Sequence, residues 1–270
     1  MVRPDTIMMP ERMITHTWSN PFLYLVAAVV ADALGLDEYE SVASTLSMGK
    51  TACSAFEPKL LSRGTLHRRY WICAFCVNQH ANICGGVPPE PPRDSPAYGR
   101  WDACRRDTVT GEPFTPCGCK EPKHFNESPD ECELNKFDDM LQYLNEEAPG
   151  LCLVAAVDPG FEIFSRLWCI AEFVQADISR IPQNVCVLTN RVFDPDVRDL
   201  SLYCKLSMLT VADCQATRPE DKEEIFAKIQ NIDEFDSRLQ AVIFGERGFL
   251  SSKFAGFDLI PAAARTARNL

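Results

Sequence analysis

The sequence predicts an α/β domain built on a five-stranded parallel sheet flanked by helices. Three observations support this fold class. Short apolar runs alternate with helical patterns along most of the chain. Residues 151–157 (LCLVAAV) and 184–190 (NVCVLTN) are apolar without alternation, which is typical of strands covered on both faces. Strands separated by helices of ten or more residues pair in parallel through right-handed crossovers.

The predicted strands, in chain order, are residues 13–17, 70–77, 151–157, 184–190 and 208–212. A helix is expected over residues 21–36, because Pro21 suits a first helical turn and Ser19 or Asn20 suits the cap before it. A second helix, over residues 137–147, precedes the third strand. We therefore expect the flavodoxin-like strand order 2-1-3-4-5.

Composition is that of one enlarged globular domain. Apolar residues make up 46% and charged residues 24% of the 270 residues. The formal charge of -11 repels phosphate backbones and argues against nucleic acid as a partner. The start of the chain lacks a secretory signal, and the longest apolar run, residues 22–36, is too short to span a bilayer. We expect a cytoplasmic protein with no membrane partner.

Residues 84–132 interrupt the alternation of strands and helices after the second strand. This segment is rich in proline, glycine and cysteine and shows little periodicity. An irregular stretch of this length inside a compact domain needs a reason. We interpret it as an insert held by something other than a hydrophobic core. Residues 38–69 show weak helical character, PEDKEEIFAKIQNIDEF predicts a strong helix, and residues 247–270 are expected to form a C-terminal tail.

Metal-ligating side chains gather in the insert. They are Cys84, Cys104, Cys117, Cys119, His124 and Cys132. Zinc prefers four tetrahedral thiolate or imidazole ligands, and such a site can fold a loop outright. The insert has one C-x-C pair and no second tight pair, whereas a zinc finger normally has two. Structural zinc and free thiols are therefore both left open. Cys73 and Cys76, on a predicted strand, would point to opposite faces.

Polar side chains follow the predicted strands, where doubly wound sheets bind their ligands. They are Thr17, Trp18, Asn78, Gln79, His80, Asp158 and Asp213. The helix after the third strand carries one further candidate. Its core face is formed by Phe164, Trp168 (or Leu167), Ala171 and Val174. Glu172 lies on an adjacent stripe, where apolar neighbours should raise its pKa. The alternative, which periodicity alone favours, is a helix-edge glutamate that is solvated or paired with Arg166 or Arg180.

Several segments resemble Toll/interleukin-1 receptor (TIR) domains. SRLWCIAEF is similar to the S-x-W-C-x-x-E-L segment of these domains, especially in plants. VFDPDVRDL, residues 192–200, is similar to the stretch that follows their fourth strand. THTWSNPF and a second strand ending in V-N-Q-H resemble a wider set of eukaryotic TIR-like domains. The resemblance covers roughly residues 14–229 without the inserts, and the segments occur in the matching order.

The resemblance implies an activity as well as a fold. In catalytic TIR domains the glutamate of this helix is needed to cleave the bond between nicotinamide and ribose in NAD, and that role falls here on Glu172. Trp18 or Trp168 would stack on a base or on nicotinamide, and Ser165 would hydrogen-bond a ribose hydroxyl. Thr17 and Asn78, at the strand ends, complete the predicted binding set. The implied partners are NAD or a related dinucleotide and other TIR-like domains, including copies of the chain itself.

The chain also departs from the family pattern. TIR domains usually open with a serine-phenylalanine-arginine type sequence where this chain has ITHTW, and the insert replaces their short loop after strand two. Many TIR domains are adaptors without activity. Two alternatives to an NAD glycohydrolase therefore stand: a non-catalytic module that signals by self-association, and a zinc-stabilised interaction module. Topology also permits a Cys–His nucleophile of Cys169 with His16 or His80.

Overall fold

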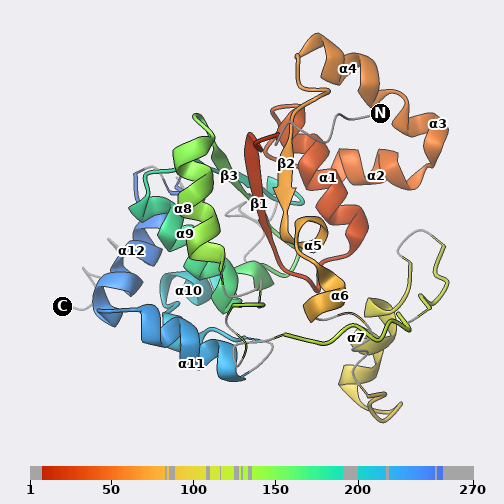
Figure 1. The fold of residues 1–270 in the computed structure, drawn as a ribbon. Helices are drawn as coiled ribbons and strands as arrows, with labels where there is room; N and C mark the ends of the chain where they lie inside the picture. Colours follow the sequence, from red (N-terminus) through yellow and green to blue (C-terminus); the bar gives the residue numbers. More distant parts are fainter. Residues whose placement is uncertain are drawn as a thin grey trace.

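The computed structural model describes residues 8–82, 84, 89–107, 110–115, 117–124, 128, 130–132, 136–190, 200–216, 219–246 and 248–251. Its centre is a parallel sheet with helices on both faces (Figure 1). Helices α1 (Phe22–Ala33) and α2 (Glu40–Ser47) lie on one side of the sheet, and α8 (Phe137–Glu147) and α9 (Leu167–Ile178) lie on the other. The predicted α/β class with a parallel sheet is confirmed.

The strands are β1 (Arg12–His16), β2 (Tyr70–Ile72), β3 (Cys152–Ala156) and β4 (Gln183–Cys186). In the described part of the chain the sheet has four strands in the order β2-β1-β3-β4. Every residue of β3 is buried, as the absence of alternation predicted. Successive residues of a strand face opposite sides, so Met13 joins the core on the α9 side and Ile14 the core on the α1 side.

The predicted fifth strand, residues 208–212, is wrong. The chain there leaves helix α10 (Leu200–Ser207) and forms a short 3₁₀ helix, η4 (Val211–Asp213). Val211 is fully buried, but its N–H donates to the carboxylate of Asp236 at 2.7 Å instead of to a neighbouring strand. A short apolar run signals burial and does not distinguish a strand from a buried turn. The five-stranded order 2-1-3-4-5 is corrected accordingly.

The second strand is shorter than predicted. Pairing of β2 with β1 ends at Ile72, and the chain continues as the short helices α5 (Cys73–Cys76) and α6 (Gln79–Asn82). Beyond Ile72 the backbone satisfies itself locally, since the N–H of Val77 donates to the carbonyl of Cys73 at 3.1 Å. Cys73 and Cys76 therefore share one helical turn, and the prediction that they point to opposite faces was wrong.

The helix predicted over residues 137–147 is observed with those bounds, whereas the insert, which was expected to be irregular, contains a helix over residues 96–104. The remaining helices are α1 (Phe22–Ala33), α2 (Glu40–Ser47), α3 (Lys50–Cys53), α4 (Phe56–Ser62), α7 (Pro96–Cys104), α8 (Phe137–Glu147), η1 (Glu162–Ser165), α9 (Leu167–Ile178), α11 (Pro219–Lys228) and α12 (Ile232–Phe244). The acidic segment predicted as one helix forms two, α11 and α12, because the Asn231 side chain caps α12 by accepting from the N–H of Glu234. None of the described helices has the length and apolarity needed to cross a membrane.

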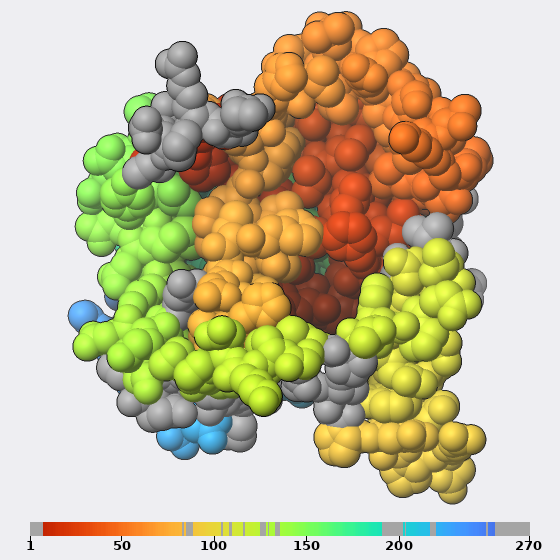
Figure 2. All heavy atoms as spheres, turned by 45° about the vertical axis from the view of Figure 1, so that its right-hand side comes forward, coloured from red at the N-terminus to blue at the C-terminus, as the bar shows by residue number. Residues whose placement is uncertain are grey.

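The first residues of the predicted C-terminal tail pack against the domain. Phe249 and Leu250, inside the predicted tail, are buried, and the N–H of Leu250 donates to the carbonyl of Ile243. Residues 252–270 lie outside the described residues, as do residues 191–199, which hold most of the VFDPDVRDL segment. Figure 2 shows much of the insert, in yellow, as a lobe beside the sheet-bearing body.

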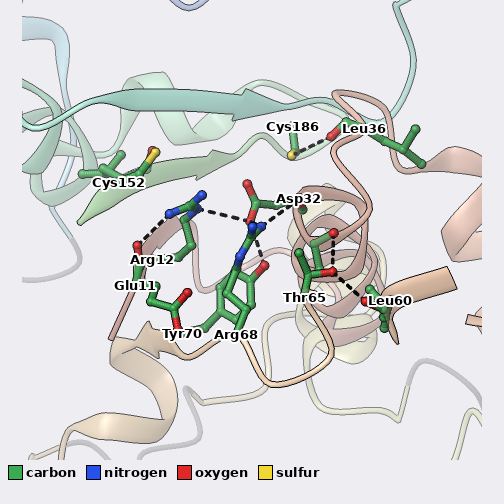
Figure 3. A network of polar contacts seen from close by, with 12 residues as sticks. Glu11, Arg12, Asp32, Leu36, Leu60, Thr65, Arg68, Tyr70, Cys152 and Cys186 are labelled. Atoms are coloured by element: carbon green, nitrogen blue, oxygen red, sulfur yellow. Dashed lines mark hydrogen bonds and ion pairs between the residues drawn. The ribbon is translucent and has the colours of Figure 1, made fainter. Parts of the chain in front are cut away.

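A buried charge network closes the amino end of the sheet (Figure 3). Asp32, in the last turn of α1, is 6% exposed. Its Oδ2 lies 3.6 Å from Arg12 Nε and 3.4 Å from an Arg68 guanidinium nitrogen, and it accepts the hydroxyl of Tyr70 at 2.7 Å. A carboxylate is unfavourable at a helix carboxyl end, so these cations and the phenol compensate it.

Replacing Asp32 by alanine should destabilise the protein strongly. The change leaves Arg12 and Arg68 without their shared carboxylate. Breaking a buried ion pair costs about 3–5 kcal/mol, and the partial exposure of both arginines reduces this to about 2–3 kcal/mol. Urea denaturation measures the effect, with Tyr70→Phe as a milder variant that loses one hydrogen bond, or about 1 kcal/mol. Equal stability of the two variants would contradict this account.

Candidate functional site

The turn that follows β3 positions α9 at the carboxyl edge of the sheet. Asp158 is the second residue after β3, and its carboxylate accepts the N–H groups of Gly160 (3.0 Å), Glu162 (3.0 Å) and Ile163 (2.9 Å). These bonds fold η1 and direct the chain into α9. Asp158, expected among the ligand-binding groups at the strand ends, is thus occupied by the backbone of this turn.

Helix α9 turns Glu172 toward the sheet. Leu167, Ala171 and Val174 are buried on its core face, as predicted. The Glu172 carboxylate accepts the hydroxyl of Thr15, on β1, at 2.5 Å. The Glu172 residue is partly exposed to solvent. Its carboxyl group is nevertheless surrounded by protein atoms, and this desolvation raises its pKa to about 7 against the opposing effect of the Thr15 hydrogen bond.

Cysteine, histidine and tryptophan side chains meet at the same edge of the sheet. Cys73, the first residue after β2, accepts the indole N–H of Trp18 at 3.2 Å and lies 3.7 Å from Nε2 of His16. Burial and, next, the negative charge of Glu172 raise the pKa of Cys73 to about 12. Trp18 and Glu172 therefore lie at the same edge of the sheet, Trp18 through its bond to the Cys73 sulfur and Glu172 through its bond to Thr15.

The Cys–His nucleophile is not supported by this geometry. The Cys169 thiol donates to the backbone carbonyl of His16 at 3.5 Å and does not face its ring nitrogens. Burial raises the pKa of Cys169 well above its ordinary value and lowers the pKa of His16. Both groups are therefore uncharged at neutral pH, whereas a nucleophilic cysteine needs its thiolate.

The other predicted binding residues have partners elsewhere. Trp168 donates its indole N–H to Asp221 of α11 at 3.5 Å and packs its ring edge-on against Phe137 of α8, with centroids 5.2 Å apart. The Ser165 hydroxyl donates to the backbone carbonyl of Glu162. The structure thus directs Trp168 toward α8 and α11.

Thr17 and Asn78 take part in local structure at the strand ends. The Thr17 hydroxyl lies 2.9 Å from that of Ser19, which donates to the Glu162 carboxylate at 3.2 Å. The Asn78 side chain begins α6 by accepting the N–H groups of His80 and Ala81. These contacts hold the strand ends in place around the site.

Two exposed aromatic side chains, Phe22 and Phe75, were not singled out from the sequence, unlike Trp18. Trp18 is 46%, Phe22 55% and Phe75 60% exposed. The rings of Phe22 and Phe75 meet edge-to-face with centroids 6.0 Å apart. Phe75 was assigned to a strand, and only the early end of β2 brings it onto a helix facing α1. Thr15 was also missed, because nothing in the sequence pairs it with a residue 157 positions later.

A cluster of four potential metal ligands lies at the base of the insert. Atoms of His80, Cys84, Cys117 and Cys119 all lie within 4.8 Å of one another, so the cluster could bind a metal. Nδ1 of His80 lies 3.3 Å from the Cys84 sulfur and 3.5 Å from that of Cys117, and the sulfurs of Cys84 and Cys119 are 3.2 Å apart.

Three of the six predicted ligands, Cys84, Cys117 and Cys119, are in this cluster. His124 and Cys132 are not; His124 uses its backbone to bond Ala81 and Asn82, and Cys132 is buried. The Cys104 side chain lies outside the described residues. His80, predicted at a strand end, was missed as a ligand. The available signal was its spacing, H-x-x-x-C, which places both residues on one face of a helical turn.

A separate groove of 410 Å³ lies between α9, α11 and α12. Ala171 and Val174 line it from α9, and Ile225 and Phe235 line it from the other helices. Glu172 is not among its lining residues. This groove is therefore distinct from the strand-end site.

Comparison with protein-family models, with curated proteins and with solved structures finds no match to this chain. The candidate site therefore stands on its own geometry and chemistry.

Glu172 should make the protein less stable as the pH rises. Its pKa is about 7 in the folded protein against 4.5 for a free glutamate, so the folded state holds the proton more tightly. The stabilisation is complete below about pH 4.5 and is lost as the pH rises through about 7, a change of about 2–3 kcal/mol. Urea denaturation at pH 5 and pH 8 should show this loss in the wild type and not in Glu172→Gln. The same pH dependence in both proteins would refute the assignment.

Proposed function

We propose that this chain is a TIR-like domain that cleaves NAD at the bond between nicotinamide and ribose, with Glu172 as the catalytic carboxylate. The observation that carries the proposal is a desolvated carboxylate at the carboxyl edge of a parallel α/β sheet, held by Thr15 and facing the end of β1. The observed order β2-β1-β3-β4 agrees with the first four positions of the flavodoxin-like arrangement expected for such domains.

The chemistry suits this environment. As the C–N bond breaks, its electron pair leaves with nicotinamide, which is already a cationic leaving group and needs no general acid. Positive charge develops on the ribosyl carbon, and an ionised carboxylate stabilises it most effectively where water is excluded. Water then adds to the ribosyl carbon and loses a proton. Because the pKa of Glu172 is about 7, the reaction should accelerate as the pH rises through neutrality.

Trp18 is the binding residue best placed in this proposal. Its ring is 46% exposed, and its N–H donates to the Cys73 sulfur. Burial and, next, the negative charge of Glu172 raise the pKa of this cysteine. An exposed, oriented indole can stack on nicotinamide or on a base. Thr17, Ser165 and Asn78 then support the site through the local contacts they make. Trp168 anchors α9 to α8 and α11.

Purified protein incubated with NAD should release nicotinamide, measured by chromatography. Glu172→Gln should reduce the rate at least about 100-fold, because the transition state loses its stabilising charge. Asp177→Asn, an exposed change on the same helix, is the matched control and should leave the rate unchanged. Absence of release at high protein concentration would overturn the proposed activity, and equal rates for Glu172→Gln and the wild type would overturn the role of Glu172.

A second candidate function is a zinc-stabilised interaction module, in which the insert is the functional surface. The cluster of His80 and three cysteines favours it, since thiolate and imidazole are the ligands of structural zinc. The two candidates differ in one respect that can be measured. A module of this kind releases no nicotinamide.

A further inference from the structure

We infer that His80, Cys84, Cys117 and Cys119 form the complete coordination shell of one zinc ion, and that this ion fastens the insert to the carboxyl edge of the sheet next to Cys73 and Trp18. The inference rests on the proposed presence of zinc and assigns its ligands and its purpose.

The distances between the four donor atoms fit a tetrahedral ion. With Zn–S bonds of about 2.3 Å and Zn–N bonds of about 2.0 Å, a tetrahedron separates two sulfurs by about 3.8 Å and nitrogen from sulfur by about 3.5 Å. The observed separations from Nδ1 of His80 are 3.3 Å and 3.5 Å, and Cys84 and Cys119 are 3.2 Å apart. Small outward shifts of these exposed or half-buried side chains accommodate the ion.

Two separate chain segments supply the ligands. His80 lies in α6, and Cys84 follows one turn later, with its N–H bonded to the carbonyl of Gln79 at 2.8 Å. Cys117 and Cys119 lie in the second half of the insert, more than thirty residues after Cys84. An ion that joins these segments closes a long loop that has little apolar core, and the binding free energy of the ion becomes folding free energy. Such an ion attaches a segment rich in proline, glycine and cysteine to α6.

Lys123 completes the electrostatics of the cluster. Its ammonium group lies 3.1 Å from the Cys84 sulfur and 3.8 Å from that of Cys119, and it also donates to the carbonyl of His80. A zinc ion with three thiolates and one neutral imidazole carries one net negative charge, which this ammonium neutralises. Three soft sulfur ligands with one imidazole select zinc over magnesium or calcium. With all four positions filled by protein, the ion is structural.

The metal cluster connects to the strand-end site through one short helix. Gln79, beside His80 in α6, donates its side-chain amide to the carbonyls of Cys73 (3.2 Å) and Ala74 (3.4 Å). These residues form the first turn of α5. The Cys73 sulfur in turn anchors the indole of Trp18. An ion that holds α6 in place therefore also holds Cys73 and, through its sulfur, the indole of Trp18.

The first test measures the metal in the full chain, purified under reducing conditions. We expect about one zinc per chain, and after replacement by Co²⁺ the strong visible bands and thiolate charge-transfer absorption of a tetrahedral sulfur site. Cys119→Ser and His80→Ala should each lose the ion or these bands. Cys204→Ser, an exposed cysteine on α10, is the control and should keep both. Lys123→Met should weaken zinc binding about 10-fold or more.

The second test measures the coupling to the sheet. Alkylation of Cys73, followed by peptide mapping, should accelerate several-fold when a chelator removes zinc, while Cys152 at the opposite end of the sheet stays protected. Absence of zinc, or full binding by Cys119→Ser, overturns the ligand assignment. An unchanged Cys73, or equal acceleration of Cys152, overturns the local fastening. Neither test uses NAD, so a failure of the proposed hydrolase activity is seen separately.

Discussion

The rest of the structure depends on the compensated burial of Asp32 at the amino end of the sheet. One carboxylate there joins the last turn of α1 to the start of β1 through Arg12 and to the start of β2 through Tyr70, and Arg68 adds a second cation. Helix α1, β1 and β2 are thereby fixed at one end. Their other ends, which carry Thr15, Trp18 and Cys73, are placed relative to one another as a consequence.

The carboxylates at the two ends of the sheet differ in the partners that offset their desolvation. Asp32 is satisfied by cations and a phenol, which is the pattern of a structural ion pair. Glu172 receives one short hydrogen bond from Thr15, and its desolvation remains largely uncompensated, so its pKa rises to about 7. A carboxyl group whose pKa lies near neutral pH, at the edge of the sheet where ligands bind, is a candidate functional group. The difference in compensation, rather than burial alone, distinguishes the two sites.

Much of the fold follows from local patterns. The unbroken apolar run of β3 and the periodicity of α8 and α9 predicted their places closely, because burial on both faces and amphipathic spacing are written in consecutive residues. The prediction of a fifth strand was wrong because Val211 can be buried equally well in a strand and in a 3₁₀ helix. Its backbone N–H bonds Asp236, and the chain forms the 3₁₀ helix. The sequence did not predict His80 as a metal ligand, because two of its partners, Cys117 and Cys119, lie more than thirty residues away in the chain.

By itself the sequence determined the α/β class, the parallel pairing and the presence of a cysteine-rich insert, and its resemblance to TIR domains singled out Glu172. Only the tertiary structure decided that Glu172 bonds Thr15 on β1, that β2 ends in a helical turn presenting Cys73 to Trp18, and that His80 joins the insert's thiols. The physical reason is separation along the chain. Periodicity and propensity report on neighbours within a few residues, whereas desolvation and ligand geometry arise from groups that meet only when the sheet has formed.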